Sequence, residues 1–158
     1  MKKLLIAFLG MFLLLNVACS RDDDSSSSSS SVVGSWYMYS VSVNGTVLVN
    51  GSSQAINNSQ VASACVQKTT LTFNENGTGN VTSWDDTSGS CTQVQNDDFT
   101  YTYNQSSKAL TIKTSTNTDV TTLKSLTNTE MIGEETVSNQ DIGGYIFTGK
   151  ITTTLKKK

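Results

Sequence analysis

Short runs of alternating apolar and polar residues recur between residue 32 and residue 158 of the chain. Residues 99–103 show the pattern most clearly, because one Phe and two Tyr alternate with Thr. Residues 145–155 repeat it, with Tyr, Phe, Ile and Leu among the odd-numbered positions. Such alternation places apolar side chains on one face of a strand. No segment shows the periodicity of a long amphipathic helix, so the pattern predicts an all-β domain.

Composition and strand spacing indicate an antiparallel sandwich or barrel. The chain has no proline, and it is rich in Thr, Ser, Asn and Gly, which suit strands joined by tight turns. We expect about eight to ten strands in residues 32–158. A closed barrel would also remove the exposed edges that Thr-rich strands otherwise offer for aggregation.

Turn signals and polar segments divide this domain. Asn44-Gly45 lies between two runs of β-branched and aromatic residues, which predicts a hairpin at that point. Residues 50–64 are polar, and we expect a long loop or a short helix there. Residues 85–96 and 138–143 are expected to be loops as well.

Several function classes are disfavoured by what the chain lacks. A net charge of −2 gives no electrostatic reason to expect a nucleic-acid partner. The absence of histidine removes the commonest general base and the commonest metal ligand. The pairs Asp85-Asp86 and Asp97-Asp98 match no calcium-loop spacing and are interpreted as solvated loop acids. No phosphate loop, nucleophile elbow or cofactor motif is visible, so we expect no enzyme, no catalytic residues, no metal and no cofactor.

The first 18 residues have the form of an export signal. Lys2 and Lys3 precede an apolar run at residues 4–15. As a helix this run would rise about 18 Å, which is too short for a hydrocarbon core of roughly 30 Å. A positively charged start followed by a short apolar run is typical of a signal peptide rather than of a membrane span.

The end of this signal resembles the lipobox of bacterial lipoproteins. Small residues, Val17-Ala18, lead directly into Cys19, while Asn16 stands where that family usually has Leu. The resemblance implies cleavage before Cys19 and lipid attachment to it, which would anchor the protein to a membrane. The alternative is a plain secretory signal whose nearby cysteine is accidental.

The segment after Cys19 carries a charged cluster and then a serine run. Residues 20–24 read Ser-Arg-Asp-Asp-Asp and resemble the surface-export signal of Bacteroidetes lipoproteins; the alternative is a solvated charge run at the membrane edge. Residues 25–31 are all serine, which predicts a flexible tether. We therefore expect a signal peptide at residues 1–18, a lipidated tether at 19–31 and one domain at 32–158, in an outer-membrane lipoprotein at the cell surface.

The domain itself resembles a lipocalin-like barrel. Gly34-Ser35-Trp36 is similar to the Gly-x-Trp signature of lipocalins, which place an arginine of the last strand over this Trp; here residues 156–158 offer only Lys. The longer pattern is similar to the lipocalin-like domain of many Bacteroidetes lipoproteins. It implies an antiparallel up-and-down barrel whose ligands are generally undefined. The pattern comprises Cys65, residues 71–78, Cys91, a Tyr-rich strand, residues 110–112, residues 123–131 and a Lys-tipped final strand.

Lipidation of Cys19 would leave two cysteines in the exported domain. An even number in an oxidising compartment predicts a disulfide between Cys65 and Cys91. The bridge would close a loop of about 25 residues. The alternative is two free buried thiols.

The large aromatic residues are the candidates for a ligand pocket or a core. An eight-stranded barrel is just wide enough either to be filled by side chains or to hold one small ligand, and a cavity above roughly 300 Å³ would favour binding. The faces that carry the aromatics in residues 99–103 and 145–155 bear no charge, so we expect a small hydrophobic ligand. A surface interaction or accessory protein with the barrel as scaffold is the alternative. The candidates are Trp36, Phe73, Phe99, Tyr101, Tyr103, Tyr145 and Phe147.

Overall fold

The computed structural model describes residues 30–49, 51–142 and 144–158. The expected signal peptide, Cys19 and most of the serine tether lie outside these residues. The described part is almost entirely β-structure, as expected. Its elements are β1 (Gly34–Val49), β2 (Ser52–Val61), the 3-10 helix η1 (Val66–Lys68), β3 (Thr70–Phe73), β4 (Thr78–Asp85), β5 (Thr92–Asn104), β6 (Ala109–Lys113), β7 (Thr118–Leu126), β8 (Glu130–Ile142) and β9 (Tyr145–Lys157).

The strands form a closed antiparallel barrel with one extra strand. Neighbours along the chain pair from β3 through β9, and β1 closes the sheet by pairing with both β3 and β9. β2 stands outside this closed set and pairs with the second half of β1. The prediction of an up-and-down barrel is therefore confirmed.

The hairpin predicted at Asn44-Gly45 is wrong. β1 runs straight through these residues and ends at Val49. Gly45 instead lies opposite Gly149 of β9, and a Cβ on Gly45 would come within 2.7 Å of the Gly149 Cα. The glycine thus permits a close approach of two strands rather than a turn.

Three segments that were expected to be loops contain strand residues. Residues 50–64 include β2, which is exposed at almost every position. Because both faces of this edge strand contact solvent, its sequence does not alternate between apolar and polar residues. β5 begins at Thr92, so Asp97 and Asp98 lie in a strand rather than in a loop. β8 continues to Ile142, with an irregular register after Val137.

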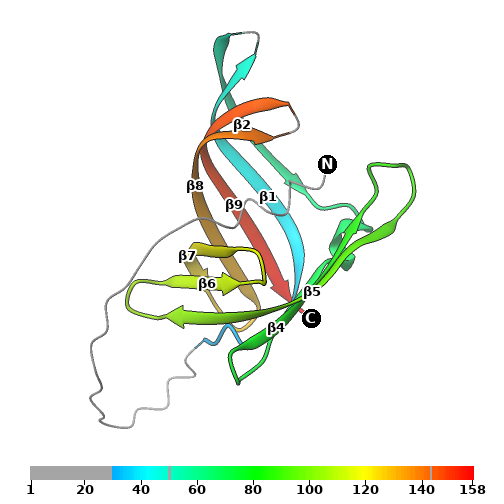
Figure 1. Ribbon diagram of the computed structural model, residues 1–158, viewed down its shortest axis with the longest axis vertical. Coiled ribbons are helices and arrows are strands. Elements are labelled where there is room, and N and C mark those ends of the chain that lie inside the picture. Colours follow the sequence, from blue (N-terminus) through cyan, green and yellow to red (C-terminus); the bar gives the residue numbers. More distant parts are fainter. Residues whose placement is uncertain (1–29, 50, 143) are drawn as a thin grey trace.

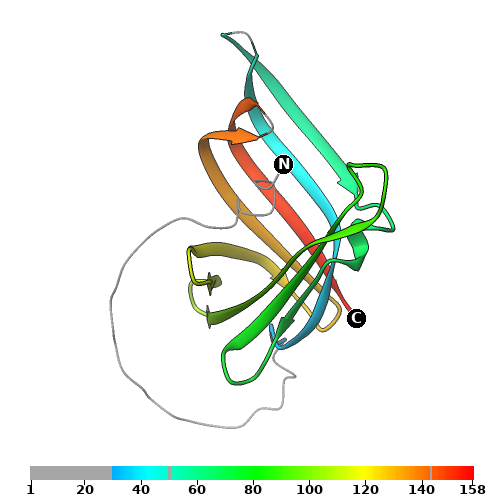
Figure 2. The same ribbon diagram turned by 45° about the vertical axis from the view of Figure 1, so that its right-hand side comes forward.

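At one end of the barrel, some strands of the wall extend further than others. Figure 1 and Figure 2 show that β1, β8 and β9 lie side by side and extend well beyond the short strands β6 and β7. Within the described residues, the pairing of β7 with β8 covers Thr122 to Leu126 and no residue before Thr122. No helix in the described residues is long and apolar enough to cross a membrane.

A fully buried tryptophan closes one end of the barrel. Trp36 donates a hydrogen bond from Nε1 to the carbonyl oxygen of Val32 at 2.7 Å. Lys157 of the last strand lies with Nζ 5.0 Å from the Trp36 ring centroid and donates to the carbonyl oxygen of Val33 at 3.1 Å. A lysine thus occupies the place over the signature Trp that the resemblance gives to an arginine.

The disulfide between Cys65 and Cys91 is confirmed. The two Cα atoms are 5.5 Å apart, and the bridge spans 26 positions of the sequence. Cys65 directly precedes η1, and Cys91 directly precedes β5. The bridge therefore ties the connection between β2 and β3 to the hairpin between β4 and β5, at the same end of the barrel as the connections between β6 and β7 and between β8 and β9.

Candidate functional site

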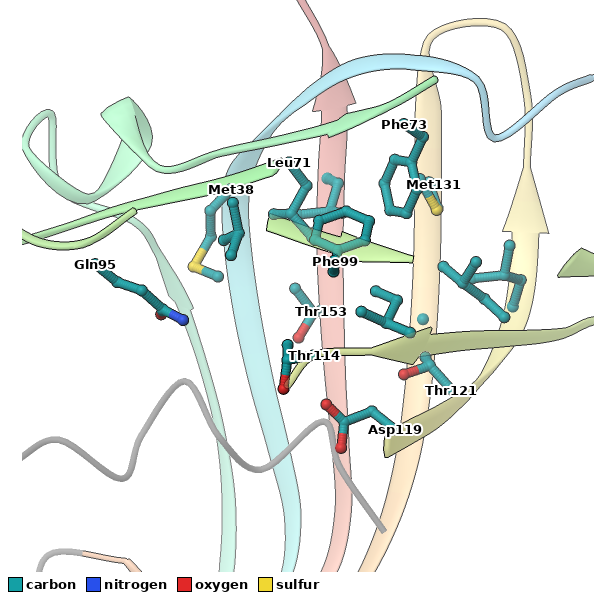
Figure 3. Close-up of a pocket in the computed structure, with 16 residues that line it drawn as sticks. Met38, Leu71, Phe73, Gln95, Phe99, Thr114, Asp119, Thr121, Met131 and Thr153 are labelled. Carbon is teal, nitrogen blue, oxygen red and sulfur yellow. The ribbon is translucent and has the colours of Figure 1, made fainter. Parts of the chain in front are cut away.

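A cavity of about 110 Å³ lies inside the barrel. Its wall is mostly apolar at the level of Phe73, Phe99 and Met131, and polar side chains gather at the other end (Figure 3). The polar lining residues are Gln95, Thr114, Asp119, Thr121 and Thr153. The cavity is therefore amphipathic along its length.

Strand alternation produces this arrangement. On β7 the side chains of Asp119, Thr121 and Leu123 are buried, while their neighbours along the strand are exposed. On β9 Thr153 and Leu155 share the inner face in the same way. Because inner positions repeat every second residue, β7 and β9 each place polar and apolar groups at successive levels of the cavity.

The cavity volume limits the ligand. Drug-sized pockets measure roughly 300–1,000 Å³, so this cavity falls below the size that would by itself favour binding. It is also smaller than the roughly 150 Å³ that accommodates benzene, which has six heavy atoms. The barrel is therefore neither filled nor spacious, and it has room for a molecule of about five heavy atoms.

Two of the seven candidate aromatics line the cavity. The ring centroids of Phe73 and Phe99 are 5.3 Å apart in an edge-to-face arrangement. Phe99 lies directly over Gly79 of β4, where a Cβ would come 2.3 Å from its Cε2 atom. The absence of a side chain at Gly79 therefore leaves the space that the Phe99 ring occupies in the cavity wall.

Four further candidates are packed around the barrel interior without lining the cavity. Trp36 belongs to the buried core cluster, and Tyr101 packs on Phe73 with its hydroxyl donating to the Asn74 carbonyl oxygen at 2.6 Å. Tyr103 is half-buried against the same core. Phe147 is buried over the glycine pair of β1 and β9.

The assignment of Tyr145 to the pocket or core requires correction. Its side chain is 55% exposed. It is the first residue of β9 and pairs in register with the last residue of β8, in the part of these strands that extends past β6 and β7 (Figure 2). An inward-facing position there has no opposite wall to pack against.

Sequence reasoning missed the most unusual residue of the cavity, Asp119. This aspartate is 1% exposed and lines the cavity. Neither carboxyl oxygen has a hydrogen-bond partner among the described residues, and the same is true of Oε2 of Glu135 on β8. Burial, with a smaller contribution from the Glu135 charge, raises the pKa of Asp119 to about 8. Burial also raises the pKa of Glu135 to about 7.

The faces that were expected to bear no charge, in residues 99–103 and 145–155, belong to β5 and β9, whereas these acids come from β7 and β8. Asp119 shares strand parity with the buried Leu123, and this was the one available signal. The apolar Val120 suggested instead that the even-numbered positions face the interior, yet Val120 is the exposed neighbour of Asp119.

The acidic pairs near Cys91 show ordinary turn and strand roles. Asp85 accepts a hydrogen bond from the backbone N–H of Thr87 at 3.0 Å, and Asp98 accepts one from the side-chain amide of Asn80 at 2.9 Å. Across residues 30–49, 51–142 and 144–158, no group of three or more His, Cys, Asp or Glu residues is placed to hold a metal ion.

Comparison with known proteins adds one finding. A family model described as a lipocalin-like domain matches residues 32–133. The match runs from Val32 into β8 and includes Asp119 but ends before Glu135. No curated protein and no solved structure matches the chain.

Proposed function

The chain belongs to the lipocalin-like domain family, and from this premise we propose that its barrel binds a small, largely apolar molecule rather than catalysing a reaction. The observation that carries the proposal is the internal cavity, whose wall combines Phe73, Phe99 and Met131 with a few polar side chains. Apolar walls with a small number of polar groups are the usual composition of small-molecule sites.

The cavity size sets the affinity that such binding can reach. The best small ligands gain at most about 1.5 kcal/mol per heavy atom, so one of about five heavy atoms reaches roughly −7.5 kcal/mol. That corresponds to a Kd of roughly 3 μM. Binding should therefore be sought at micromolar to millimolar concentrations and with short-chain compounds.

The proposal includes an anchor at the cell surface. The lipobox resemblance at Cys19 and the charged cluster at residues 20–24 support a lipoprotein of the Bacteroidetes type in the outer membrane. The disulfide between Cys65 and Cys91 supports export, since disulfides persist in oxidising compartments. Stable anchoring requires more than one acyl chain. Intact mass of the membrane-extracted protein tests this part, and an unmodified Cys19 would refute it.

A surface interaction role is the second candidate, favoured by exposed apolar residues on the projecting hairpins. Leu48 of β1 pairs in register with Ile146 of β9, and both are exposed, as is Tyr145. A partner protein would cover these side chains while the barrel served as scaffold. This role predicts no response of the cavity residues to small molecules.

Cavity occupancy can be tested directly with a filling variant. Leu110→Phe places a larger side chain in the cavity wall, whereas Val120→Phe adds the same ring to the outer face of the neighbouring strand. Butan-1-ol at millimolar concentration should shift NMR signals of the native protein and of Val120→Phe but not of folded Leu110→Phe. No response of the native protein to any short apolar compound would reject the binding function.

A further inference from the structure

The carboxyl group of Asp119 points into the cavity without a partner. Its side chain is 1% exposed, and both of its oxygens are unpaired within the described residues. Figure 3 shows the group turned toward Thr114 and Thr153, away from the aromatic wall. A buried polar group without a hydrogen bond is costly, so this arrangement indicates a group that is completed by something bound.

The charged residues of the surrounding strands do not supply a counter-ion. Lys113 of β6 follows the cavity-lining Ile112 and is exposed on the outer face. Lys124 of β7 and Lys150 of β9 both pair with Glu134 on the outer face, at 3.6 Å and 3.0 Å.

The remaining inner-face charges near Asp119 are also acidic. Glu135 of β8 is half-buried with one unpaired oxygen. Asp97 of β5 shares the parity of the cavity-lining Gln95 but is exposed, and it accepts a hydrogen bond from the Gln95 amide at 2.8 Å. Within the described residues, the inner faces of β5, β7 and β8 therefore present carboxyl groups and no cationic side chain, and the inner-facing Lys157 of β9 lies over Trp36 at the other end of the barrel.

We propose that the ligand is a small primary alkylamine bound as its ammonium ion, with nitrogen at Asp119 and Glu135 and with the alkyl chain against Phe73, Phe99 and Leu123. This inference rests on the proposed binding function and specifies its ligand class. An ammonium group offers three donors, which matches the three unpaired carboxyl oxygens of the two acids. The cavity as a whole has room for about five heavy atoms, the number in an amine with four carbon atoms.

Ammonium binding should depend on pH in a defined direction. Burial raises the pKa of Asp119 to about 8 and of Glu135 to about 7, so both acids are largely neutral at pH 5. A primary amine resembles the lysine side chain and stays protonated up to about pH 10. Binding should therefore be weak at pH 5 and strong at pH 8–9, and at pH 7 it should release protons from the two acids.

Calorimetric titration with n-butylamine, butan-1-ol and butyrate tests the ligand class, because the three share one chain and differ in charge. At pH 8 the native protein should bind butylamine at least about tenfold more tightly than butan-1-ol, and butyrate should not bind. Asp119→Asn should reduce the affinities for butylamine and butan-1-ol to similar values. Asp98→Asn makes the same change on the outer face of β5 and should leave the preference intact.

The outcomes separate this inference from the proposed function. Equal binding of butan-1-ol and butylamine, an undiminished preference in Asp119→Asn, or binding of Ca²⁺ in place of butylamine overturns the amine assignment alone. Failure of all three compounds to bind overturns the binding function as well. Should Asp119→Asn not fold, Glu135→Gln and the native protein at pH 5 provide the same test, and each must show a reduced preference for butylamine.

Discussion

The two ends of the barrel interior bury polar groups in opposite ways. At the closed end, Trp36 donates to the Val32 carbonyl oxygen and Lys157 donates to the Val33 carbonyl oxygen. At the cavity end, both oxygens of Asp119 lack partners within the described residues. Paired polar groups stabilise a fold, whereas an unpaired buried carboxyl lowers stability. The contrast indicates that the closed end maintains the barrel and that the cavity end serves a ligand.

Truncating the buried tryptophan should have the largest effect on stability. Trp36→Ala removes a fully buried ring and its hydrogen bond and should lower the free energy of unfolding by about 3–5 kcal/mol. Urea denaturation measures this change. Trp84→Ala, at a half-buried position beside Lys68, serves as the control and should cost clearly less. If both substitutions lowered the free energy of unfolding equally, the claim that Trp36 maintains the closed end would be contradicted.

Removing the disulfide should have the next largest effect. The double change Cys65→Ser and Cys91→Ser opens a loop of 26 positions and should lower the free energy of unfolding by about 3–4 kcal/mol. Because the bridge holds connections at the same end of the barrel as the β6–β7 connection next to Asp119, the variant should also lose ligand binding before it unfolds globally. Thermal denaturation with and without reductant gives the comparison, and a change below about 1 kcal/mol would show that packing alone holds this end.

Replacing the buried aspartate should raise stability at alkaline pH. Burial raises the pKa of Asp119 from 3.8 to about 8, so between those values the folded state holds more protons than the unfolded chain. Increasing pH through this window lowers the free energy of unfolding by order 1 kcal/mol per pH unit.

The variant Asp119→Asn should flatten that pH dependence and be more stable than the native protein at pH 8, by about 3–4 kcal/mol. The two should converge below pH 4, where the carboxyl is neutral in both states. Denaturation midpoints from pH 4 to pH 9 provide the data. A native protein whose stability rises over this range relative to the variant would show that the carboxylate is paired.

The ammonium group of Lys157 should contribute less to the free energy of unfolding than the three features above. Lys157→Met keeps the aliphatic stem but removes the ammonium group over Trp36 and its bond to the Val33 carbonyl oxygen, at a cost of about 1 kcal/mol. Lys113→Met, on the outer face of β6, is the control. Chemical denaturation distinguishes them, and indistinguishable variants would argue that Trp36 needs no cation above it.

The smallest effect is expected at Tyr145. Tyr145→Ala changes a side chain that is 55% exposed beyond the barrel wall and should alter the free energy of unfolding by less than about 0.5 kcal/mol. Thermal unfolding of this variant checks the correction made to its assignment. A loss of several kcal/mol would restore Tyr145 to the core.

The sequence predicted the barrel because its aromatic strands alternate strongly. Residues 99–103 carry a clear contrast between apolar and polar positions, and Gly34-Ser35-Trp36 added the resemblance to the lipocalin signature. The disulfide followed from the even number of cysteines left after Cys19. Where contrast is absent the prediction failed: β2 is exposed on both faces and resembles a loop in sequence.

Other errors arose where one residue type serves two purposes. Asn-Gly is a strong turn signal, but Gly45 is needed for the approach of Gly149. On β7 the threonines suit either face, so the sequence did not show whether Asp119 or Val120 points inward. Only pairing with the neighbouring strands determines which face of β7 points inward. The sequence therefore could not predict that the Asp119 carboxyl lines the cavity.

The most direct measurement is a pH titration of the Asp119 side-chain carboxyl carbon by ¹³C NMR, with and without n-butylamine. The free protein should show a midpoint near pH 8, and butylamine should move it downward by about one unit or more, because a nearby cation favours the ionised form. A midpoint near pH 4 that does not respond to butylamine would contradict both the buried, unpaired carboxyl and its role in binding.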